Sequence, residues 1–125
     1  VTLTPQEERI RTQLATRYSS MGLQVSSAND VIDELKLERS MARKLIQLMV
    51  KENALVKITE ELLVDRTVID KLIRDVKALK AQNSKFGVGE FKNLTGLSRK
   101  HAIPLLEYLD RQRVTRRVGE ERVIL

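Results

Sequence analysis

The chain contains an internal repeat with a period of 60 residues, and this repeat restricts the fold more than any other feature of the sequence. Sliding the chain by 60 residues aligns Leu37 with Leu97, Arg39 with Arg99, Ala42 with Ala102 and Leu45 with Leu105. Glu60-Glu61 aligns with Glu120-Glu121. Both aligned residues are apolar in the pairs Ile58 and Val118, Leu63 and Val123, and Val64 and Ile124. A repeat of this length indicates two copies of one supersecondary unit. We therefore predict two domains, at residues 1–65 and 66–125.

The first unit shows signals for three helices and a hairpin. Thr4 can cap a helix, Pro5 suits its first position, and Glu7 completes a capping box. A second cap signal at residues 27–30 predicts a short helix, and apolar spacing predicts a third helix at residues 39–52. Two short strands are expected at residues 54–58 and 62–64.

The second unit repeats this plan. An amphipathic helix is expected from Val68 to Leu79, broken at Asn83-Ser84, then a short helix near residues 88–94 and a third helix from Ser98 to Gln112. Residues 114–118 and 122–125 are predicted to form the hairpin. Three helices and a β wing define the winged helix, a form of helix-turn-helix. The predicted fold class is mostly α with small β hairpins (α+β), as two tandem winged helices.

Positive charge is concentrated in the second half of the chain. The net charge is +6, but residues 1–65 hold 9 Lys/Arg against 10 Asp/Glu, whereas residues 66–125 hold 14 against 7. A basic domain favours nucleic acid or another anionic surface as its partner. The chain begins with Val1 and not with Met, which favours a fragment of a longer protein.

Residues suited to catalysis, metal binding or membrane insertion are scarce. The chain has one His, no Cys, no phosphate-binding glycine motif and no run of about 18 apolar residues. We therefore expect no enzymatic activity, cofactor, metal, small-molecule substrate or membrane partner. With aromatic residues at 3%, the chain also lacks the stacking platform of single-strand binders.

The start of the second unit's third helix is the strongest candidate site. Ser98 occupies the cap position, and Arg99 and Lys100 follow in the first turn. Cations at this positive end of the helix dipole disfavour the free helix but suit an external phosphate. The preceding turn could add backbone N–H groups through Thr95 and Gly96. The full set of candidate RNA-binding residues is Lys92, Asn93, Thr95, Gly96, Ser98, Arg99, Lys100, Arg116, Arg117 and Arg122, with Arg113 also in the hairpin.

Other residues of this region are interpreted as structural. Phe91 and Tyr108 correspond to apolar residues of the first unit and are expected in the core. His101 corresponds to Met41, which favours a partly buried packing role over an RNA contact. Pro104 removes one helical hydrogen bond, so a kink toward a ligand and a bend without function both stay open.

The segment FKNLTGLSRKHAIPLLEYLDRQRVTRRVGEERVIL, residues 91–125, resembles the C-terminal winged helix of the bacterial SelB family, which delivers selenocysteyl-tRNA in translation. The part SRKHAIPLLEYLD carries most of the resemblance, and the preceding unit fits the tandem arrangement of that family. The resemblance implies a cytoplasmic factor that binds the SECIS hairpin of a selenoprotein mRNA through its last winged helix. It also implies the rest of the elongation factor and the ribosome as partners.

Two other functions remain open from the residues alone. Many winged helices are DNA-binding regulators that place a long third helix in the major groove. Pro104 and the small basic area argue against that use. A protein-interaction winged helix is the third alternative, for which the near-neutral first unit is suited, because fold does not determine function.

Overall fold

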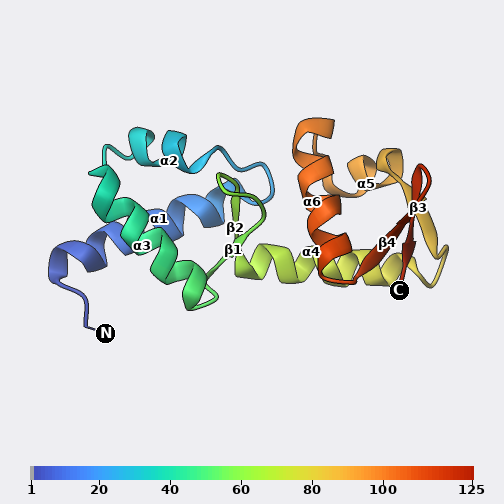
Figure 1. The fold of residues 1–125 in the computed structure, drawn as a ribbon, viewed down its shortest axis with the longest axis horizontal. Coiled ribbons are helices and arrows are strands. Elements are labelled where there is room, and N and C mark those ends of the chain that lie inside the picture. The colour runs from blue at the N-terminus through green and yellow to red at the C-terminus, as the bar shows by residue number, and fades with distance from the viewer. Residues whose placement is uncertain (1) are drawn as a thin grey trace. The chain divides into compact units, whose positions relative to one another are not determined.

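The computed structural model describes residues 2–125 and consists of two compact units, one reaching to Val68 and the other beginning at Ile69. The first unit contains α1 (Pro5–Met21), α2 (Ala28–Glu34), α3 (Arg39–Lys51), β1 (Leu55–Lys57) and β2 (Leu63–Asp65). Then follow α4 (Arg66–Leu79), β3 (Lys85–Gly87), α5 (Val88–Thr95), α6 (Arg99–Arg111), β4 (Thr115–Val118) and β5 (Glu121–Ile124). Figure 1 shows three helices and a small antiparallel sheet in each part, which confirms the predicted winged-helix class.

The predicted helix starts of the first unit are confirmed. The Thr4 hydroxyl accepts a hydrogen bond from the Glu7 N–H at 3.1 Å, and the Glu7 carboxylate accepts one from the Thr4 N–H at 2.9 Å. Ser27 caps α2 by accepting from the Asp30 N–H at 3.2 Å. Side-chain caps therefore satisfy N–H groups that the first helical turn leaves without a partner.

We expect the capping box of α1 to make stability depend on pH. The Thr4 N–H, and then Lys44 at 3.1 Å, stabilise the charged Glu7 carboxylate, so its pKa is lowered from 4.5. A lowered folded-state pKa adds stability above the unfolded pKa, and this stability is lost as pH falls through the folded pKa. Glu7→Gln should therefore lower the melting temperature at pH 7, and the difference from the unsubstituted chain should disappear as pH falls below about 4. A difference at pH 3 as large as that at pH 7 would contradict this assignment.

Each unit has its own aliphatic core on the inner faces of its helices and sheet. The apolar residues at helical spacing in α3 and α6 are all buried: Ala42, Leu45, Ile46, Met49, Ala102, Leu105, Leu106 and Leu109. In the second unit, Phe91 is fully buried as predicted and stacks on Phe86 with ring centroids 6.2 Å apart. Burial of these side chains fixes α6 against α5 and the sheet.

The 60-residue repeat is visible in the backbone. The third helices span residues 39–51 and 99–111, and positive φ angles recur at Lys36 and Gly96 and at Asn53 and Arg113. The offset changes in the second strand of the hairpin. Lys57 pairs with Leu63, whereas Arg117 pairs with Arg122. Leu63 is therefore the structural counterpart of Arg122, and the predicted pairs Leu63–Val123 and Val64–Ile124 are wrong by one residue.

The second unit also contains a strand that the sequence did not predict. β3 pairs antiparallel with β5, which gives a three-stranded sheet in the order β3-β5-β4. Among the described residues of the first unit, from position 2 to Val68, the sheet is the two-stranded pair of β1 and β2. With three residues, β3 is too short to show the alternating pattern from which strands are recognised.

Candidate nucleic-acid interface

The first turn of α6 carries exposed positive charge. Ser98 occupies the predicted N-cap position with extended backbone (φ −74°, ψ 164°), and Arg99 and Lys100 are exposed. The predicted bond from a first-turn N–H to the Ser98 hydroxyl is absent within the described chain; this hydroxyl lies 3.4 Å from Nδ1 of His101. The N–H groups of the turn are therefore not covered by a side-chain cap, and two cations flank them.

The equivalent turn of the first unit is neutralised by acidic residues. Arg39, the counterpart of Arg99, forms an ion pair with Asp33 at 3.4 Å. The residue equivalent to Asp33 is Asn93, and no ion pair of Arg99 or Lys100 is found among residues 2–125. The Glu38 carboxylate caps α3 by accepting from the Met41 N–H at 2.6 Å, where Ser98 forms no cap.

Two further acidic residues of the first unit have uncharged counterparts in the second unit. Glu34 pairs with Arg17, and Glu52 pairs with Arg11. Their counterparts 60 residues later are Leu94 and Gln112. The second unit is therefore basic partly because acids that pair with cations in the first unit are missing from it.

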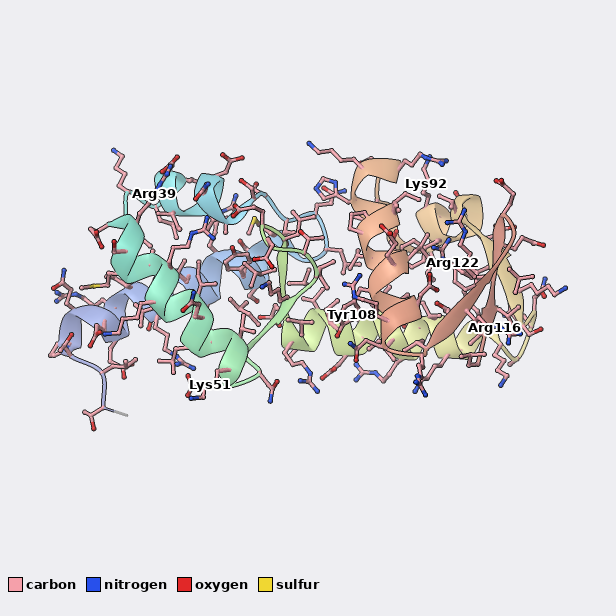
Figure 2. The ribbon with its side chains drawn as sticks, in the orientation of Figure 1. Arg39, Lys51, Lys92, Tyr108, Arg116 and Arg122 are labelled. Carbon is pink, nitrogen blue, oxygen red and sulfur yellow. The ribbon has the colours of Figure 1, made fainter. Side chains whose placement is uncertain are left out.

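Lys92 and Asn93 lie in α5, the short helix expected near residues 88–94. Both are exposed, and Figure 2 shows Lys92 at the edge of the second unit where α6 begins. We name Lys92, Asn93, Arg99 and Lys100 the helix-start cluster. They combine three cations with one amide, which is a donor-rich surface suited to phosphate oxygens.

In the turn between α5 and α6, the N–H groups of Gly96 and Leu97 donate hydrogen bonds to nearby residues of the same segment. Gly96 adopts φ 72° and donates its N–H to the Lys92 carbonyl at 2.7 Å. The Thr95 hydroxyl accepts from the Leu97 N–H at 3.3 Å and donates to the Phe91 carbonyl at 2.8 Å. The expectation that Thr95 and Gly96 present N–H groups to a phosphate is therefore not supported, because this turn closes on itself.

The wing arginines face in different directions. Arg116 is in register with Val123, and Arg117 with Arg122, so Arg116 and Arg117 lie on opposite faces of the sheet. Arg117 shares the face of Arg122, on the side of the helices, and its Nε donates to the Gly119 carbonyl at 3.1 Å. Figure 2 shows Arg116 toward the edge opposite Lys92. Arg117 therefore lies on the helix-facing side of the sheet, whereas Arg116 belongs to its outer face.

Arg122 is buried and bound to Asp110, so the structure does not expose this predicted RNA contact. Only 5% of its surface is exposed, and Nη2 donates to Asp110 at 3.1 Å. Figure 2 shows its side chain between α6 and the strands. Its acidic partner Asp110 lies 12 positions earlier, on a helix, so the charged residues near Arg122 in the sequence do not indicate that it is buried. The alternation of the strand around Ile124 could have indicated an inward position.

The remaining predictions for α6 are partly confirmed. His101 is half-buried as expected. Tyr108 is half-buried and not part of the core, with the Arg111 guanidinium 5.8 Å from its ring centroid. The helix continues through Pro104 from Arg99 to Arg111.

Residues 2–125 contain no group of three or more His, Cys, Asp or Glu side chains that could hold a metal ion. An open hollow of about 850 Å³ in the first unit, between α1 and the start of α3, has a mixed lining. It includes the polar residues Gln6, Arg9 and Glu38 and the apolar residues Ile10, Leu37 and Met41. Within the same described part, no helix is long and apolar enough to cross a membrane.

The fold and the exposed helix start define a tandem winged-helix protein whose second unit is basic. Residues 77–124 match the family described as elongation factor SelB, winged helix. The chain is 33% identical over 124 residues to a selenocysteine-specific elongation factor of Desulfomicrobium baculatum. The alignment covers 99% of this chain and 20% of that protein, so the chain spans about a fifth of the length of this relative.

Two solved structures have the same fold. One is the mRNA-binding domain of elongation factor SelB from E. coli, in complex with SECIS RNA; the TM-score is 0.79 at 19% identity, covering 98% of both chains. The other is a bacterial selenocysteine-specific elongation factor, with a TM-score of 0.77 at 27% identity, covering 98% of this chain and 20% of that one. The fold agreement therefore extends over both winged helices.

Proposed function

We propose that this chain is the mRNA-binding part of a selenocysteine-specific elongation factor, and that its second winged helix binds a SECIS hairpin. The exposed helix-start cluster, which lacks the acids of the first unit, carries the proposal. The resemblance to a SelB domain seen with SECIS RNA supports the RNA partner. In this function the chain works in the cytoplasm without catalysis of its own, joined to the factor's other domains and brought to the ribosome by them.

The proposed contacts are Lys92, Asn93, Arg99 and Lys100, with Arg117 from the wing. These side chains are exposed and rich in N–H donors, so they suit phosphate oxygens. An A-form stem has a deep, narrow major groove that a helix cannot read, so selectivity should come from hairpin shape and unpaired bases. Ser98 can join the contact through its hydroxyl, since that group caps no N–H.

The direct test is a titration of an RNA hairpin against a DNA duplex of the same stem sequence, at several salt concentrations. We expect the hairpin to bind at least tenfold more tightly at about 150 mM salt. Equal affinity for the two would contradict the proposal, and tighter binding of the duplex would favour the DNA-binding regulator.

We also predict that Asn93→Asp weakens hairpin binding about three- to tenfold. The substitution restores the acid that pairs with Arg39 in the first unit, so it should pair with Arg99 and repel phosphate. An exposed ion pair contributes up to about 1 kcal/mol, and repulsion of the RNA adds to this. The readout is the dissociation constant for the hairpin. Asn93→Ala is the control, because it removes the amide without adding charge and should change the affinity less than Asn93→Asp does.

A further inference from the structure

We propose that Asp110, Thr115 and Arg122 hold the wing in a fixed position relative to α6 and thereby position the second unit's RNA-binding surface. We name these three residues the polar trio. The inference rests on the proposed RNA-binding function, but it assigns a role to residues that are not available for RNA contact.

The polar trio connects three elements of the second unit. Asp110 lies in the last turn of α6, Thr115 begins β4, and Arg122 lies in β5. The Asp110 carboxylate accepts from the Thr115 hydroxyl at 2.6 Å and from Nε and Nη2 of Arg122 at 3.3 and 3.1 Å. Thr115 is 1% exposed and Arg122 is 5% exposed. One helical carboxylate therefore binds both strands of the wing through directional hydrogen bonds.

The first unit reaches the same fold without these groups. The counterparts of Asp110 and Thr115, 60 residues earlier, are Val50 and Leu55, and the strand pairing makes Leu63 the counterpart of Arg122. Leu55 and Leu63 are buried at 2% and 3% exposure. Apolar packing at these three positions is thus sufficient to join a hairpin to the third helix.

Stability alone does not account for the polar trio. Replacing a buried ion pair with packed apolar residues is often neutral or stabilising. Apolar contact is also non-directional, whereas hydrogen bonds fix both distance and angle. In the first unit a hollow of about 180 Å³ borders Val50 and Leu63, together with charged residues such as Arg43 and Lys57. A function in orienting the wing explains why the polar trio occurs only in the basic unit.

The position of the wing affects the proposed RNA surface directly. Arg117 is in register with Arg122, so the bonds to Asp110 fix the strand position that carries Arg117. Arg99 and Lys100 lie at the opposite end of the same helix as Asp110. The polar trio therefore sets the placement of Arg117 relative to the helix-start cluster.

The first test transfers the apolar residues of the first unit into the second. We expect the triple variant Asp110→Val, Thr115→Leu, Arg122→Leu to melt at an equal or higher temperature and to bind the hairpin at least tenfold more weakly. A folded triple variant with unchanged affinity would overturn the proposal. Thr115→Val and Thr115→Ser form a matched pair. This pair still tests the proposal if the triple variant does not fold. Thr115→Val should weaken binding about threefold, and Thr115→Ser should retain it; equal affinity of the two would count against the proposal.

The second test is independent of RNA. The chain has no cysteine, so spin labels can be attached at Glu107→Cys on α6 and Glu120→Cys in the wing turn, both exposed. We expect a narrow distance distribution by pulsed electron paramagnetic resonance in the otherwise unsubstituted chain. The distribution should broaden with Thr115→Val and not with Thr115→Ser. An equally narrow distribution in both variants would overturn the positioning role, whereas failure of the unsubstituted chain to bind the hairpin would overturn only the proposed function.

Discussion

Replacing the two cations in the first turn of α6 should nearly abolish hairpin binding while leaving the fold intact. Arg99 and Lys100 are exposed and form no ion pair in the described part of the chain, so their removal breaks no internal contact of that kind. A hydrogen bond to a charged group contributes roughly 1.5–3 kcal/mol, which corresponds to about ten- to a hundredfold in affinity. Arg99→Ala and Lys100→Ala should each weaken binding by this amount.

The first unit offers a matched control for this prediction. Arg39 occupies the position of Arg99 but pairs with Asp33, so Arg39→Ala should leave hairpin affinity unchanged. Thermal unfolding of all variants establishes that the fold survives, and titration of the hairpin gives the dissociation constants. Unchanged affinity in the Arg99→Ala, Lys100→Ala double variant would exclude the helix start as the binding site.

The sequence predicted the repeated architecture well because helix signals are local. Caps such as Thr4 and Ser27 and the apolar spacing of α3 and α6 each depend on residues within four positions. The structure confirms these starts and buried faces. The sequence did not reveal strand β3, nor that Leu63 corresponds to Arg122 and not to Val123. Both depend on strand pairing, which involves distant parts of the chain.

The candidate site was predicted only in part, since charge in a sequence does not reveal which partner a cation has. Arg99 and Arg122 look equally basic, but one is exposed and the other is bound to Asp110. Arg39 resembles Arg99 in sequence and differs from it through Asp33. The repeat alignment shows Asn93 at the position of Asp33. Only the ion pair between Asp33 and Arg39 in the structure shows that this change leaves Arg99 without an acidic partner at that position.

We expect the isolated second unit to carry nearly all of the hairpin affinity. In the first unit, ion pairs neutralise most of the cations: Arg11 with Glu52, Arg17 with Glu34, Arg39 with Asp33, Arg43 with Glu61, Lys44 with Glu7 and Lys57 with Glu60. Residues 66–125 instead hold 14 Lys/Arg against 7 Asp/Glu. A chain of residues 66–125 should bind the hairpin within about threefold of the complete chain, and residues 1–65 should bind it weakly or not at all.

The dependence of hairpin affinity on salt concentration tests this prediction quantitatively. Each phosphate contact releases counterions, so the logarithm of the affinity should fall with the logarithm of salt concentration by about 0.7–0.9 per neutralised charge. The proposed surface offers Lys92, Arg99, Lys100 and Arg117, so about three to five contacts predict a slope of roughly −2 to −4. The measurement is a hairpin titration of both halves and the complete chain at several salt concentrations, with circular dichroism to establish that each half folds. The same slope in the complete chain and in residues 66–125 would place the phosphate contacts in the second unit. A much steeper slope in the complete chain would assign contacts to the first unit and contradict this prediction.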